Sequence, residues 1–277
     1  MITDSCLTTS NEIEQYTVLA IDEILQHVPP SNCLPVKWTF IKEADSPGLR
    51  QSAINGQSIK VTEQNGTLHL SICSEDFIGI PTGALQGWLE LEIVYAMIKA
   101  DTNSYRFNFQ RHIFPLMPLS GSALYFIREL VEHLSRALKR LEATKIITKM
   151  DRGLPQLYYY FHTINPTAED KDLYKKLMPH NWSRASHLCR KVSEYIALSY
   201  LTDRGVGFSH SLLSDWQKQY GYSKKDQTFI EDLVFVGDHY QDRKFSFRLV
   251  EMFKLLRDNL LIAGSDDIAA NNPASNV

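Results

Sequence analysis

The 277-residue sequence has no long apolar segment and no long run of charges of one sign. Its longest apolar stretches, around residues 89–98 and 255–263, contain charged residues and fall short of the roughly 20 apolar residues that a membrane-spanning helix needs. The 29 basic and 32 acidic residues are mixed along the chain, so we expect neither a nucleic-acid partner nor a membrane partner. The N-terminal residues lack the basic start and apolar run of a secretory signal, which favours a cytoplasmic location.

Cysteine is scarce, and its four copies form no Cys-x-x-Cys pair. A chain of this length does not need disulfides to fold, so we expect reduced thiols at Cys6, Cys33, Cys73 and Cys189. His187 precedes Cys189 by two residues, which is compatible with a metal pair or a Cys-His nucleophile. Residues two apart on a helix point to different sides, however, and a small buried thiol is the interpretation we favour for Cys189.

The local signatures of the large enzyme classes are also missing. The sequence has no Gly-x-Ser-x-Gly elbow, no Walker loop, no dinucleotide-binding fingerprint and no kinase motif set. Residues 203–207 (DRGVG) contain two glycines but do not join a strand to a helix, so we interpret them as a helix-ending turn. An enzyme is still possible, because a site assembled from distant residues leaves no local signature.

What the sequence does contain is a change of periodicity about a third of the way along the chain. Apolar residues at helical spacing predict a first helix over 12–28, and alternation predicts a strand over 36–43. Asn65-Gly66 stands between alternating runs at 58–63 and 67–73, which predicts a β-hairpin.

From residue 81 onward the pattern is helical. Residues 85–100 are apolar on nearly every face and predict a buried helix, while 101–118 predicts an irregular connection. Further helices are predicted at 122–149, 168–178, 184–201, 210–220, 225–235 and 245–262. We therefore predict an α+β fold with a small N-terminal antiparallel sheet and a buried helix, followed by a mostly helical C-terminal half. The predicted division is a mixed domain at 1–155, a helical region at 156–263 and a disordered tail at 264–277.

The buried helix contains two carboxylates, Glu90 and Glu92, which point in two different apolar directions. At least one of them is expected to be buried, and a buried charge is costly unless it is paired, hydrogen-bonded or bound to a metal. The basic residues considered as partners are Arg106, Arg111, His112, Arg128 and His133. Two interpretations remain open: an internal ion pair that holds the fold, or an acid with a catalytic role.

The order of these elements, with Leu91-Glu92-Ile93-Val94-Tyr95 on the buried helix, resembles zincin-like metallopeptidase domains. In that family the buried helix carries His-Glu-x-x-His, two zinc-binding histidines and a glutamate that activates water. The resemblance matches Glu92 to this general base, but Leu91 and Tyr95 stand at the histidine positions. It therefore implies a degenerate domain that holds no catalytic zinc, and we expect neither a metal nor another cofactor.

The resemblance extends to the long helix at 122–149. There Glu129 would match the third ligand of the glutamate-ligand branch of the family, with His133 in place of an acidic residue four positions later. Glu129 and His133 could also bind a metal in a protein unrelated to that family, since residues four apart share a helix face. A solvent-exposed Glu-His pair, however, fits the charged face of this helix better.

Two hypotheses for function follow. The first is a non-catalytic binding or scaffolding module with an unidentified protein or small-molecule partner, in which Tyr95, Arg106, Arg111, Glu129 and His133 are candidate binding residues. The second is a metal-dependent hydrolase that uses Glu92 as general base beside Glu129 and His133. A homo-oligomer is possible.

Two aromatic groups leave further alternatives open. A partner helix could bind a groove in the C-terminal helices lined by Trp216, Tyr220 and Phe235, although core packing explains these residues equally well. The tyrosine-rich residues 157–162 could line a pocket, but we favour a packing role between the two halves of the fold.

Overall fold

The computed structural model describes residues 6–28, 34–41, 59–101, 103–117, 122–163, 168–240 and 242–261. Cys33, the predicted strand end at 42–43, the hairpin residue Ser58, the helix end at Ile262 and the predicted tail at 264–277 lie outside the described residues. The chain forms two compact units, each discontinuous in sequence. The first unit comprises residues 1–102, 142–163 and 204–208, and the second comprises 103–141, 164–203 and 209–277. The predicted division into a mixed domain at 1–155 and a helical region at 156–263 stays a prediction.

The first unit contains a three-stranded sheet made of β1 (Val36–Ile41), β2 (Ile59–Gln64) and β3 (Thr67–Cys73). β2 and β3 form the predicted hairpin, in which Asn65 and Gly66 have φ values of 52° and 72°, as a tight hairpin turn requires. β1 runs parallel to β3, so the strand order is β1-β3-β2 and the sheet is mixed. The α+β class is confirmed, but the expectation of a wholly antiparallel sheet is wrong. Alternation along a strand identifies its buried face and not the direction of its neighbour.

Helix α1 (Ser10–His27) starts with a capping box formed by Thr9, which precedes it, and Glu12 in its first turn. The Thr9 hydroxyl accepts a hydrogen bond from the Glu12 amide at 3.3 Å, and the Glu12 carboxylate accepts one from the Thr9 amide at 3.1 Å. α1 packs against the 3₁₀ turn η3 (Ser74–Phe77) and against α3 (Thr82–Ala100). α3 is buried along most of its circumference, as its apolar sequence predicts.

Helix α6 (Gly153–Thr163) packs closely against α3 in the first unit. No helix is predicted from the sequence between residues 149 and 168, so α6 is an element that the sequence did not reveal. The close approach of α6 to α3 depends on Gly87 of α3, where a Cβ atom would lie only 2.0 Å from the Pro155 carbonyl oxygen. Tyr159 and Tyr160 of the tyrosine-rich segment are buried, and the Tyr159 ring lies 5.7 Å from that of Trp88. These tyrosines therefore pack inside the first unit.

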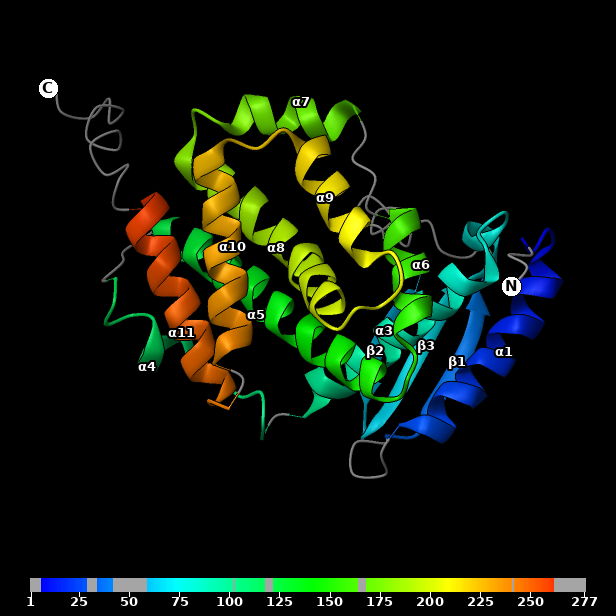
Figure 1. Cartoon of the computed structure of the whole chain (residues 1–277). Helices are drawn as coiled ribbons and strands as arrows, with labels where there is room; N and C mark the ends of the chain where they lie inside the picture. The colour runs from blue at the N-terminus through cyan, green and yellow to red at the C-terminus, as the bar shows by residue number, and fades with distance from the viewer. Residues whose placement is uncertain are drawn as a thin grey trace, which may run out of the picture. The chain divides into compact units, whose positions relative to one another are not determined.

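The second unit is helical in its described residues. Its helices are α4 (Phe109–His112), α5 (Ser122–Lys149, to residue 141 in this unit), α7 (Ala168–Leu177), α8 (Asn181–Asp203), α9 (Ser209–Tyr220), α10 (Lys224–His239), α11 (Phe245–Leu256) and the π-helical turn η4 (Arg257–Leu261). The long predicted helices are confirmed with ends shifted by a few residues. α10 packs against both α8 and α11 (Figure 1). None of the described helices is long and apolar enough to cross a membrane.

Candidate functional site

The buried carboxylate of α3 is Glu90, which is fully buried, whereas Glu92 and Tyr95 are half-buried. Glu90 forms an ion pair with Arg152, with 2.5 Å between the guanidinium Nε and a carboxylate oxygen. Gln156 of α6 donates hydrogen bonds to the other Glu90 oxygen at 3.3 Å and to the Gly87 carbonyl at 2.9 Å. Of the two interpretations left open by the sequence, the internal ion pair describes Glu90, and its partner is none of the basic residues considered from the sequence.

Arg152 is the partner that sequence reasoning missed. It also contacts Glu23 of α1, with 2.8 Å between nitrogen and oxygen, so one guanidinium links α1 and α3. Burial raises the pKa of Glu90 to about 7, although the positive charge of Arg152 acts in the opposite direction. Since Arg152, which directly precedes α6, lies 62 residues after Glu90, no spacing pattern joins the two. This cluster holds three helices together.

Glu129 and His133 lie together on α5 in the second unit, with 3.5 Å between Nε2 and the carboxylate. Glu129 also accepts a hydrogen bond from the Ser186 hydroxyl of α8 at 2.9 Å. Burial lowers the pKa of His133, and Arg136 adds to this effect. The structure therefore brings together two of the three residues of the hydrolase hypothesis, while Glu92 belongs to the first unit.

The remaining predicted binding residues, Arg106 and Arg111, are exposed in the second unit. The Arg111 amide donates to the Asn108 side chain at 3.0 Å, which caps the short helix α4. In the part of the chain that the structure describes, no three His, Cys, Asp or Glu side chains are grouped so that they could hold a metal ion.

His187 and Cys189 are both buried in the second unit. The His187 ring nitrogen lies 3.1 Å from the Tyr222 hydroxyl, and burial, aided by Lys191, lowers the pKa of His187 to about 4. Burial raises the pKa of the Cys189 thiol, which therefore stays protonated. These two residues have the properties of core side chains, as the sequence analysis favoured.

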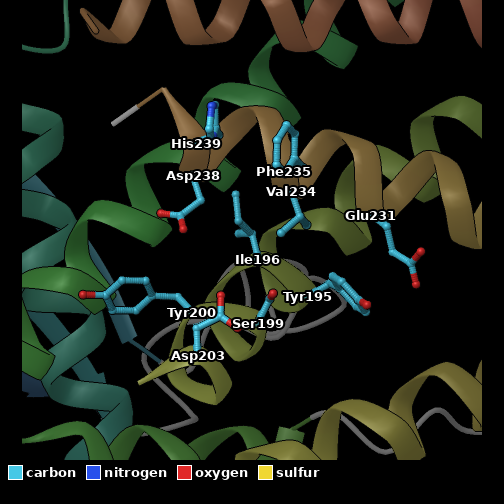
Figure 2. A pocket seen from close by; sticks show the side chains of 10 residues that line it. All are labelled: Tyr195, Ile196, Ser199, Tyr200, Asp203, Glu231, Val234, Phe235, Asp238 and His239. Atoms are coloured by element: carbon cyan, nitrogen blue, oxygen red, sulfur yellow. The ribbon is translucent and has the colours of Figure 1, made fainter. Parts of the chain in front are cut away.

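A pocket of about 360 Å³ lies between α8 and α10, entirely within the second unit (Figure 2). Ile196 of α8 and Val234 of α10 face each other in its middle. The other lining residues are Tyr195, Ser199, Tyr200, Asp203, Glu231, Phe235, Asp238 and His239. The pocket thus combines an apolar middle with aromatic rings and three carboxylates.

The carboxylates occupy both ends of this pocket. In Figure 2, Glu231 lies on the side of Tyr195, and Asp238 and Asp203 lie on the side of Tyr200. Asp203 is the last residue of α8 and Asp238 the penultimate residue of α10. Negative charge at a helix C-terminus is unfavourable, because the helix dipole already makes that end negative. Both helix ends lie at the same end of the pocket, so acidic side chains and helix C-termini are concentrated there.

Aromatic rings also line the pocket: the Tyr195 and Tyr200 side chains are buried, and Phe235 and His239 are exposed. Phe235 is 60% exposed and its ring stacks on that of His239, with 4.7 Å between the centroids. The Tyr195 hydroxyl accepts a hydrogen bond at 2.7 Å from Gln217, which also donates to Glu231 at 3.0 Å. Gln217 thereby fixes the tyrosine and the carboxylate at that end relative to each other.

Sequence reasoning did not find this pocket. Of the three aromatic residues considered for a helix groove, Trp216 and Tyr220 are buried core residues and only Phe235 lines the pocket. The sequence held one signal for the pocket, namely the acidic residues Asp203 and Asp238 in the last turns of two helices. An acidic residue at that position interacts unfavourably with the helix dipole and is therefore uncommon.

The fold therefore defines the protein only by class: an α+β chain with a small mixed sheet, a helical second unit and a pocket between two of its helices. Comparison with protein-family models, with curated proteins and with solved structures finds no match.

Proposed function

We propose that this protein is a non-catalytic binding module and that the α8–α10 pocket binds an organic cation. The observation that carries this proposal is the pocket lining, in which Asp203, Glu231 and Asp238 surround an apolar middle. Carboxylates attract ammonium or guanidinium groups, and the exposed ring of Phe235 adds cation–π attraction of about 0.5–1 kcal/mol.

We further propose that the first unit is a degenerate zincin-like domain whose role is structural. Leu91 is fully buried at the first position where that family has a histidine, and its side chain has no atom that can bind a metal. The fully buried acid of α3 is Glu90, whose pKa is raised by burial, and it is engaged with Arg152 and Gln156. This arrangement supports a role for the α3 carboxylates in holding helices together.

The binding proposal predicts that n-hexylammonium occupies the pocket. In methyl-labelled protein at low salt, the methyl signals of Ile196 and Val234 are expected to shift saturably, with a Kd on the order of 1 mM, as expected for a ligand of so few atoms. NMR titration measures this directly. The methyl signals of Ile13, a buried residue of the first unit, are the internal control and are expected to stay unchanged.

n-Hexanol is the matched neutral probe, since it has the same chain length without the charge. It is expected to shift the two pocket signals at least about fivefold more weakly, because it gains no ion pairing or cation–π attraction. Equal responses to both probes, or no response at the pocket with either probe, would contradict the proposal.

A metal-dependent hydrolase remains a second candidate, because Glu129 and His133 do lie in contact. The non-catalytic proposal predicts that untagged protein contains far less than one equivalent of zinc or another transition metal. Elemental analysis measures this, with Glu129→Ala and His133→Ala run beside the parent protein. Stoichiometric metal that decreases in both variants would favour the hydrolase instead.

A further inference from the structure

We infer that the ligand of the α8–α10 pocket is a linear aliphatic polyamine, with one ammonium group at each end of the pocket. This inference rests on the proposed function, because it requires that the pocket bind cations. It goes further in naming the chemical class of the ligand, and its basis is how the charges are distributed within the pocket.

The first argument is the separation of the carboxylates. Glu231 and Asp238 are seven residues apart on α10, which is about 10.5 Å along the helix axis. A single ammonium group at one of them is too far from the other for a direct contact. Two cationic groups joined by a chain can instead reach both ends at once.

The second argument is what lies between these ends. Ile196 and Val234 lie in the middle of the pocket, and their side chains have no polar atom, so an uncharged chain of methylene groups suits this part of the lining (Figure 2). A compact dication such as a metal ion gains nothing from this apolar middle. The volume of about 360 Å³ lies near the lower end of the range for small-molecule sites, which suits a slender chain.

The third argument is the charge balance of the lining. Three of the ten lining residues are carboxylic acids, and His239 is the one that can carry a positive charge. The C-termini of α8 and α10 add partial negative charge at the end that holds Asp203 and Asp238. The end with two carboxylates and two helix termini suits a terminal primary ammonium, which offers three donors.

The test compares n-hexylammonium with 1,6-hexanediammonium and spermidine by the same NMR titration of the Ile196 and Val234 methyl signals. Both polyamines are expected to bind about two- to fivefold more tightly than the monoamine, since each gains a second exposed ion pair. Raising the salt from 20 to 300 mM is expected to reduce this advantage, because screening weakens exposed charge pairs.

Variants identify the groups responsible. Glu231→Gln and Asp203→Asn are each expected to abolish most of the advantage of the diamine over hexylammonium, because each removes the charge at one end of the pocket. Asp232→Asn is the matched control: Asp232 is exposed on α10 beside Glu231 but does not line the pocket. It is expected to leave all affinities unchanged. Circular dichroism checks that each variant folds.

The possible outcomes are distinguishable. If the monoamine and the diamines bind equally, the polyamine inference is overturned while the cation-binding function stands. If a dibasic peptide with two lysines binds more tightly than spermidine, the ligand is a peptide and the inference is again overturned. If no cation affects the pocket signals, both the inference and the proposed function fall.

Discussion

Replacing Gly87 with alanine is expected to lower the free energy of unfolding by about 3 kcal/mol or more, because the added methyl group meets backbone atoms that cannot move independently. The new Cβ would lie 2.0 Å from the Pro155 carbonyl oxygen and 2.5 Å from its carbon, so α6 must move away from α3. That movement also lengthens the hydrogen bond from Gln156 to the Gly87 carbonyl. Chemical denaturation, followed by circular dichroism, measures the loss.

Gly83→Ala is the matched control on the same helix. The nearest atoms to its added Cβ belong to the Tyr158 ring, at 2.9 Å and beyond, and a side chain can rotate away. Alanine also favours the helix by about 1 kcal/mol relative to glycine, so the net change is expected to stay within about 1 kcal/mol. Equal destabilisation by the two variants would show that the close approach of α3 and α6 is not what Gly87 maintains.

Replacing Arg152 with methionine is expected to destabilise the protein by about 3–5 kcal/mol at pH 8.5, because the fully buried Glu90 carboxylate loses its ion-pair partner. The loss is expected to be smaller at pH 6, where Glu90, whose pKa is already raised by burial to about 7, is largely protonated. Denaturation curves at both pH values measure the difference. The double variant with Glu90→Gln is expected to recover much of the loss at pH 8.5, since no buried charge then remains unpaired.

The sign of this pH dependence follows from the direction of the pKa shift. The Glu90 pKa is raised in the folded state from an ordinary value of 4.5 to about 7, so the folded protein binds a proton that the unfolded chain has lost. The stabilisation by this proton is complete below pH 4.5 and is lost as the pH rises through 7. Glu90→Gln alone is therefore expected to flatten the stability profile between these values.

Arg136→Met is the control for removal of an arginine. The Arg136 side chain is 44% exposed and lies 3.7 Å from Glu132 one helical turn away, so its loss is expected to cost less than about 0.5 kcal/mol at either pH. A similar cost for Arg136→Met and Arg152→Met, or a loss at Arg152 that does not depend on pH, would contradict the role assigned to the buried pair.

Several elements of this fold follow from local sequence alone. The Asn65-Gly66 turn is predictable because few residues adopt positive φ at two successive positions, and the structure has that turn. The long amphipathic helices are predictable from their apolar spacing, and the structure starts α5 at Ser122 and ends it at Lys149, as predicted. The burial of a carboxylate on α3 also follows, since an acid within an otherwise apolar helix has few exposed directions.

Other features depend on residues that are distant in the sequence. The parallel pairing of β1 with β3 follows from how the strands assemble, and α6 is helical despite Gly153 and Pro155 because it packs against α3. Arg152 pairs with Glu90 only because α6 brings it there.

The α+β class, the hairpin and the long helices therefore follow from the order of the residues, since these features depend on interactions between near neighbours. The mixed sheet, the partner of Glu90 and the pocket between α8 and α10 arise from packing in three dimensions. Each of these is made by segments whose separation along the chain leaves no periodic pattern, and Tyr195 and Glu231 share a pocket solely because two helices pack side by side.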